Sequence, residues 1–279
     1  MESFQRFAGL AEGEWLDLLI RSIHEREIDG VPFPGFAAEG VQRQTVGSSF
    51  EPALREAFAF YRLACAQMVG AGRPLEPGRK VLDFGVGWGR ILRFFARHAG
   101  ASDLFGVDVV PSMVEACRNT GCPAAVFGIE PRGALPFTAG TFDLAYAYSV
   151  FTHLPEPIAL HWIAELARVV KPGGRLIVTV EPHRFVTFCR TIPEETDSPW
   201  HAKLRAIVAA HPDIDEELAR RGFYYLPSGG GPDLPPEIYG DTVILPDYVE
   251  RMWAPWFRTV EYLDDPGQFW QAVVTLERI

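Results

Sequence analysis

The chain has 279 residues, of which 48% are hydrophobic and 22% charged, so it suits one large domain, or one domain with appendages, around a sizeable core. Its formal net charge of -10 and the absence of a Lys/Arg-rich run argue against a nucleic-acid substrate. The sequence shows no secretory signal and no apolar run long enough to span a membrane, and its cysteines lack CxxC spacing, so we expect a cytoplasmic protein without membrane partners.

Residues 1–75 form an N-terminal segment that we expect to be helical, to belong to the same domain and to be a candidate lid. Apolar side chains recur there at steps of three or four, a stripe that usually packs on a core: Leu54, Phe58, Tyr61, Cys65 and Met68. A turn-rich stretch over 29–35 interrupts the helices.

Residues 76–182 alternate short apolar runs with helical patterns, which is typical of stacked βαβ units and a parallel sheet. The expected strands are 80–84, 104–109, 124–127, 142–148 and 175–181. The expected helices between them are 91–97, 113–119 and 161–170, with a Gly173-Gly174 turn after the last one.

Residues 183–245 break this rhythm with many prolines and the run Gly229-Gly230-Gly231, so we expect a loop-rich insertion with a short helix or two that covers a substrate. Residues 246–279 then predict a helix near 247–252 and an antiparallel pair of strands over 258–263 and 268–277. The fold predicted is a Rossmann-like open α/β sheet of about seven strands, mostly parallel with an antiparallel last strand.

The most informative motif lies where the strand over 80–84 ends in a glycine-rich turn, at Gly85, Gly87 and Gly89. Glycines let the backbone approach a ligand, and the helix that follows directs its free N–H groups at it. A dinucleotide-binding loop would need glycine where this chain has Arg90. Asp83 would repel a pyrophosphate but suits a cationic group; it could also be a turn or helix-capping carboxylate.

A second acid, Asp108, falls near the end of the next expected strand. In nucleotide-binding α/β folds an acid at this place accepts hydrogen bonds from the ribose hydroxyls, and the alternative is an exposed acid at a strand end. Ligands of open α/β sheets bind at the carboxyl ends of strands, where Asp83 and Asp108 both lie.

Together these patterns resemble class I S-adenosylmethionine-dependent methyltransferases. Asp83-x-Gly85-x-Gly87-x-Gly89 with Asp108 is similar to the first two motifs of the family. The stretches 135–144 and 166–176 resemble its approaches to the fourth and fifth strands. The N-terminal helices and the run 146–154 resemble bacterial members that modify small molecules.

The resemblance implies S-adenosyl-L-methionine as the cofactor. It places Asp83 against the methionine amino group, Asp108 on the ribose hydroxyls and Val109 on the adenine. Gly85 and Gly87 would line the methionine and ribose, with Val86 also among the cofactor-binding residues and Tyr148 near the sulfonium. Many members carry an acid after the third strand that contacts the adenine amine, and here Glu130 could substitute for it.

Methyl transfer requires alignment of a nucleophile with the methyl carbon, and in some cases a base. The candidates follow the fourth and fifth expected strands: His153, Glu181 and His183. Residue 153 could instead belong to a helix entry, and the reaction could need no base. The stretch 148–151 has no carboxylate, so we expect no metal.

The function expected is transfer of a methyl group to an O, N or C atom of a small molecule, such as a specialised metabolite. Two alternatives remain at this stage: a nicotinamide-dependent oxidoreductase, which Asp83 and Arg90 disfavour, and a non-catalytic binding or dimerisation module, which would have lost the loop or the acids. The oligomeric state and the identity of the substrate are not encoded in any motif.

Overall fold

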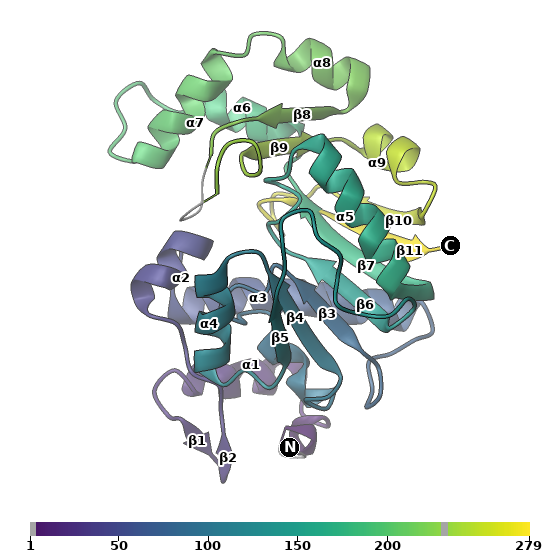
Figure 1. Ribbon diagram of the computed structural model, residues 1–279. Helices are drawn as coiled ribbons and strands as arrows, with labels where there is room; N and C mark the ends of the chain where they lie inside the picture. The colour runs from purple at the N-terminus through teal and green to yellow at the C-terminus, as the bar shows by residue number, and fades with distance from the viewer. Residues whose placement is uncertain (1–3, 230–233) are drawn as a thin grey trace. The chain divides into compact units, whose positions relative to one another are not determined.

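The computed structural model describes residues 4–229 and 234–279 (Figure 1). Residues 1–3 of the N-terminal segment and 230–233 of the insertion, with Gly230 and Gly231, lie outside the described residues. The chain divides into two compact units, Met1–Tyr146 and Ala147–Ile279, which are described separately.

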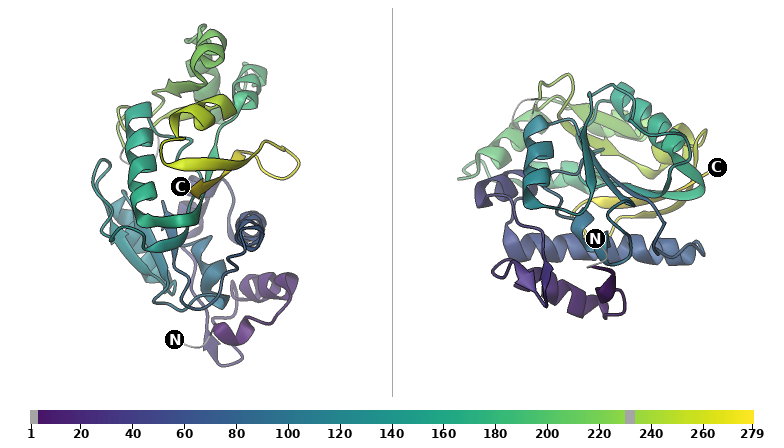
Figure 2. Two further views of the ribbon diagram at one scale, coloured as in Figure 1. Left: turned by 90° about the vertical axis from the view of Figure 1, so that its right-hand side faces the viewer. Right: turned by 60° about the horizontal axis from the view of Figure 1, so that its bottom comes forward.

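The first unit begins with helices, as expected, which Figure 2 shows from two further sides. Its long helix α3 buries Leu54, Tyr61 and Met68 completely, so the apolar stripe packs on a core. Both α1 and a later 3-10 helix, η2, contact α3. The elements of this part are η1 (Gln5–Phe7), α1 (Glu12–Arg21), β1 (Glu27–Ile28), β2 (Val31–Pro32), α2 (Glu39–Val46) and α3 (Phe50–Gly70).

Parallel strands follow within the same unit. Strand β3 pairs in parallel with β4 and with β6, and β4 pairs in parallel with β5. Helix α4 begins with Pro111 and ends at Gly121 in the left-handed conformation, a common pair of helix boundaries. These elements are β3 (Val81–Phe84), η2 (Leu92–Arg97), β4 (Leu104–Asp108), α4 (Pro111–Thr120), β5 (Ala125–Gly128) and β6 (Phe142–Ala147).

The helix predicted over 91–97 is the 3-10 helix η2. All six of its residues are buried, and Phe94 N and His98 N donate to carbonyls three residues earlier. Because no side of this segment faces water, it fills the core as a tight turn of backbone, whereas an α-helix at a surface would have an exposed face.

The second unit contains helix α5 (Glu156–Val169) and an antiparallel set of strands. Strand β11 pairs antiparallel with β7 on one side and with β10 on the other. The Gly173-Gly174 turn lies inside β7, which begins directly after α5. The remaining elements of this set are β7 (Val170–Val180), α9 (Pro246–Met252), β10 (Phe257–Leu263) and β11 (Ala272–Arg278).

The insertion is more regular than the sequence predicts. It contains three helices and a two-stranded antiparallel sheet, which share a small hydrophobic core that includes Phe185, Leu204, Leu218 and Val243. The elements are α6 (His183–Thr191), α7 (Pro199–Ala209), α8 (Ile214–Arg221), β8 (Phe223–Leu226) and β9 (Asp241–Ile244).

The main sheet has seven strands in the order β10-β11-β7-β6-β3-β4-β5. Its strands are mostly parallel and the last strand, β11, is antiparallel, which confirms the predicted fold class. Among the described helices, none is long and apolar enough to cross a membrane.

Candidate functional site

The glycine loop after β3 is fastened to the neighbouring strand. Gly85 N and Val86 N both donate to the carbonyl oxygen of Val107, at 2.8 and 2.9 Å. The Val86 side chain covers Gly106 so closely that a Cβ at residue 106 would lie 2.7 Å from Val86 Cγ2. The absence of a side chain in β4 therefore lets the loop lie against this strand.

Asp108, the last residue of β4, accepts two backbone hydrogen bonds. Gly87 N donates to its Oδ2 and Val110 N to its Oδ1, each at 2.9 Å. Gly87 has a φ of +51°, which favours glycine, and this conformation presents its N–H to the acid. Burial raises the pKa of Asp108, and the backbone donors oppose that rise. A carboxylate has about four acceptor positions, so lone pairs remain for the two hydroxyls of a ribose.

Asp83 lies inside β3, almost fully buried, and Tyr146 Oη donates to its Oδ2 at 2.8 Å. Burial raises the pKa of Asp83 to about 7, the Tyr146 hydrogen bond lowers it, and the nearby Asp108 raises it further. A cationic group beside this carboxyl would favour its ionised form. The sequence analysis missed Tyr146; its place opposite Asp83 depends on the pairing of β3 with β6.

The other residues expected at the cofactor lie near strand ends. Val109 is half-buried directly after β4, and Glu130 is exposed after β5. Tyr148 is half-buried directly after β6, in the second unit. Their contacts with a cofactor stay predictions.

His153 lies in the second unit between β6 and α5, with 20% of its side chain exposed. Its Nδ1 is 2.7 Å from the carbonyl oxygen of Gly240 and 3.9 Å from Asp241 Oδ1, and its ring stacks on Tyr239 with centroids 4.3 Å apart. A carbonyl only accepts hydrogen bonds, so Nδ1 must carry a proton and Nε2 of the neutral ring holds a free lone pair.

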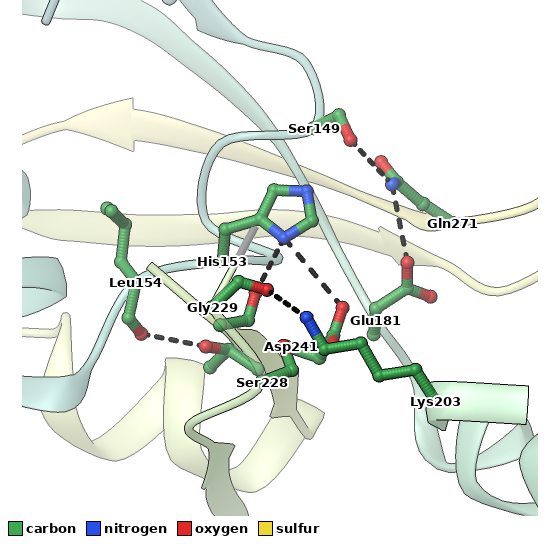
Figure 3. Close-up of polar contacts among 11 residues, drawn as sticks. Ser149, His153, Leu154, Glu181, Lys203, Ser228, Gly229, Asp241 and Gln271 are labelled. Atoms are coloured by element: carbon green, nitrogen blue, oxygen red, sulfur yellow. Dashed lines mark hydrogen bonds and ion pairs between the residues drawn. The ribbon is translucent and has the colours of Figure 1, made fainter. Parts of the chain in front are cut away.

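Backbone pairing fixes this arrangement. Gly240 N donates to the His153 carbonyl at 2.9 Å, and Thr242 N donates to the Thr152 carbonyl at 2.7 Å. Burial lowers the pKa of His153, while Asp241 opposes this effect. Figure 3 shows Nε2 turned away from Gly240 and Asp241. The ring is thus a neutral imidazole whose basic nitrogen is not occupied by Gly240 or Asp241.

Glu181 directly follows β7 and is buried. Its Oε1 accepts a hydrogen bond of 3.3 Å from Gln271 Nε2, which also donates to Ser149 Oγ at 2.9 Å. Burial, followed by repulsion from Asp241, raises the pKa of Glu181 to about 8. At neutral pH this group is mainly protonated and can donate a hydrogen bond, but it is a poor base.

His183 has a different setting from these two candidates. Its side chain is half exposed at the start of α6, and its Nε2 lies 3.1 Å from Asp215, which also pairs with Arg190. A surface ion pair of this kind favours His153 over His183 as a base. In the described ranges 4–229 and 234–279, no three His, Cys, Asp or Glu side chains gather as metal ligands would.

Comparisons with known proteins agree with the geometry of the loop. Residues 81–174 match a family model described as a methyltransferase domain. The 2-methyl-6-phytyl-1,4-hydroquinone methyltransferase of Synechocystis sp. is 35% identical over 106 residues, 37% of this chain and 32% of that protein. The ribosomal protein L11 methyltransferase of Ralstonia pickettii is 41% identical over 107 residues, 38% of this chain and 33% of that protein.

The match thus spans about a third of the length of these curated relatives. Among solved structures, an S-adenosylmethionine-dependent methyltransferase from Clostridium acetobutylicum is 9% identical and aligns over 86% of this chain and 97% of its own, with a TM-score of 0.54. The matched segment 81–174 holds the glycine loop and both acids, so this segment of the chain belongs to the methyltransferase domain family, within a class I S-adenosylmethionine-dependent methyltransferase fold.

Proposed function

We propose that this protein is an S-adenosylmethionine-dependent methyltransferase that methylates an O, N or C atom of a small molecule. The observation that carries the proposal is the glycine loop hydrogen-bonded to Asp108, with the buried Asp83 at its base. Two carboxyl groups at adjacent strand ends suit a ligand that has a diol and a cationic amine, as this cofactor has.

In this proposal Asp108 holds the ribose hydroxyls and Asp83 faces the methionine amino group. When bound, the cofactor supplies an electrophilic methyl group on a sulfonium. His153 Nε2 accepts the proton of the nucleophile, because its lone pair is free and its Nδ1–H is held by Gly240. Tyr239, Gly240 and Asp241 all belong to the insertion, which supports a role for residues 183–245 beside the methyl acceptor.

The alternatives are less well supported. A buried carboxyl at the base of the loop disfavours the pyrophosphate of a nicotinamide cofactor. A non-catalytic binding module would have no use for two buried acids, whose burial raises their pKa values. The quinol methyltransferase of Synechocystis sp. supports a small-molecule acceptor. The ribosomal protein L11 methyltransferase makes a protein acceptor the rival to exclude.

Calorimetric titration tests the proposal. We expect micromolar binding of S-adenosylhomocysteine and no binding of NADH or NADPH. A metabolite screen with labelled cofactor should then yield the acceptor, and turnover should persist in EDTA. Binding of a nicotinamide dinucleotide in place of S-adenosylhomocysteine would overturn the assignment, and loss of turnover in EDTA that Mg²⁺ restores would overturn the metal-free reaction.

The pKa of Asp83 predicts a pH dependence of cofactor binding. An ammonium group binds the ionised carboxylate, and burial raises the pKa of Asp83 to about 7, so the binding form grows as pH rises through 7. We expect S-adenosylhomocysteine to bind about tenfold more tightly at pH 8 than at pH 6. Asp83→Asn should bind weakly with a flat profile, and Glu115→Gln, at an exposed position on α4, should keep the wild-type slope. Equal wild-type affinity at both pH values would contradict this role of Asp83.

A further inference from the structure

Three polar side chains meet in the second unit: Ser149, Glu181 and Gln271, named here the Glu181 cluster (Figure 3). They come from the turn after β6, the end of β7 and the residue before β11. Gln271 Nε2 donates to both of the others, so both hydrogens of its amide are used.

Two atoms of the Glu181 cluster have no hydrogen-bond partner among the described residues. They are Glu181 Oε2 and Gln271 Oε1, and both are inaccessible to solvent. A buried polar atom without a partner destabilises the folded state, so two such atoms on neighbouring, hydrogen-bonded side chains indicate a place that a ligand completes.

The hydrogen-bond pattern assigns the chemical character of these two atoms. Glu181 Oε1 accepts from Gln271, which leaves Oε2 to carry the proton when the acid is neutral. The charged groups that act on this acid are Asp241, which raises its pKa, and Arg184, which lowers it. Arg184 is itself bonded to Asp264 at 2.6 Å. The pair therefore offers one donor, Glu181 Oε2–H, and one acceptor, Gln271 Oε1.

Backbone strain at Ser149 accompanies the cluster. Ser149 has a φ of +58°, an unfavourable conformation for a residue other than glycine, and its N–H donates to Thr179 Oγ1 at 2.6 Å. This conformation places Ser149 Oγ where it accepts from Gln271. Strain of this kind concentrates at functional sites, where it holds a side chain in a set position.

We propose that Glu181 and Gln271 bind a neutral hydroxyl group of the methyl acceptor, which accepts from Glu181 Oε2–H and donates to Gln271 Oε1. The proposal rests on the proposed function for the identity of the ligand as a methyl acceptor. A hydroxyl satisfies both atoms at once. An ether lacks the hydrogen for Gln271 Oε1, and a carboxylate would meet that oxygen and the nearby charge of Asp241.

Binding of simple probes, followed by ligand-observed NMR with and without S-adenosylhomocysteine, tests this assignment. We expect phenol to bind the wild-type protein about tenfold more tightly than anisole or benzoate. Glu181→Gln keeps a donor at the place of Oε2 and should bind phenol within about twofold of wild type. Glu181→Met has a similar size but no donor and should lose about tenfold.

The same samples separate the possible outcomes. Equal phenol binding by wild type and Glu181→Met would mean that the cluster holds only water, and would overturn the proposal. Glu181→Gln as weak as Glu181→Met would show that an ionisable carboxyl is needed and would also overturn it. Retained affinity for S-adenosylhomocysteine shows that each variant is folded. Loss of that affinity in the wild type alongside the expected phenol pattern would contradict the methyltransferase and keep the hydroxyl site.

Discussion

Replacing His153 with alanine is expected to lower the rate of methyl transfer at saturating cofactor by about 100-fold or more, the contribution of a positioned general base. The reason is the neutral imidazole: Nδ1 donates to the Gly240 carbonyl, so Nε2 keeps the lone pair that accepts a proton. Affinity for S-adenosylhomocysteine should stay within about twofold of wild type, because no cofactor-binding role is assigned to His153. Stopped assays at saturating cofactor, with the acceptor from the metabolite screen, measure this effect.

Two controls sharpen the test of His153. His183→Ala removes a half-exposed histidine that pairs with Asp215, and it should leave the rate unchanged. Burial lowers the pKa of His153, so wild-type kcat should be flat across neutral pH and fall only in acid, below the ordinary histidine pKa of about 6.5. Full turnover by His153→Ala would transfer the role to Glu181, or show that no base is needed.

The second large effect is expected at Asp108. Asp108→Ala should weaken binding of S-adenosylhomocysteine about 10- to 100-fold, since hydrogen bonds to a charged group contribute about 1.5–3 kcal/mol. The same change leaves Gly87 N and Val110 N without their acceptor, so the loop loses its attachment to β4. Titrations should be run at pH 8, where Asp83 is mostly ionised.

An isosteric variant separates the two contributions of Asp108. Asp108→Asn keeps one acceptor oxygen and should lose less affinity than Asp108→Ala, while Glu115→Gln on the exposed side of α4 should bind as wild type does. Normal cofactor binding by Asp108→Ala would refute the role of the residue at the end of β4, and with it the proposed cofactor site.

The cofactor residues could be predicted because they are local in sequence. Asp83 and the glycines lie within one strand and its turn, and Asp108 ends the next strand, so a βαβ pattern is enough to bring them together. Tyr146 could not be predicted, because its hydrogen bond to Asp83 depends on the register of β3 against β6. The contact between Gln271 and Glu181 joins residues 90 positions apart, which no local pattern encodes.

The insertion was predicted less well for a different reason. Its prolines indicated loops, yet Pro199 is the first residue of α7 and Pro182 directly precedes α6. Just beyond it, Pro246 is the first residue of α9. Proline is favoured at the first position of a helix, where its missing N–H costs no hydrogen bond. The prolines therefore mark where helices begin, and a proline-rich composition alone does not distinguish that from loop.

The hydrogen bond between His153 and the Gly240 carbonyl has a consequence for how this protein can change its acceptor over evolution. A main-chain oxygen is present whatever residue occupies the position, so neighbouring side chains of the insertion can be exchanged without loss of the group that holds the imidazole. Residue 240 itself is constrained, because a Cβ there would lie 2.2 Å from the Leu226 carbonyl oxygen and 2.8 Å from the Tyr225 ring. Selection can thus vary the wall around an acceptor while the proton-accepting nitrogen keeps its tautomer, so that new specificities need not begin with a loss of catalysis.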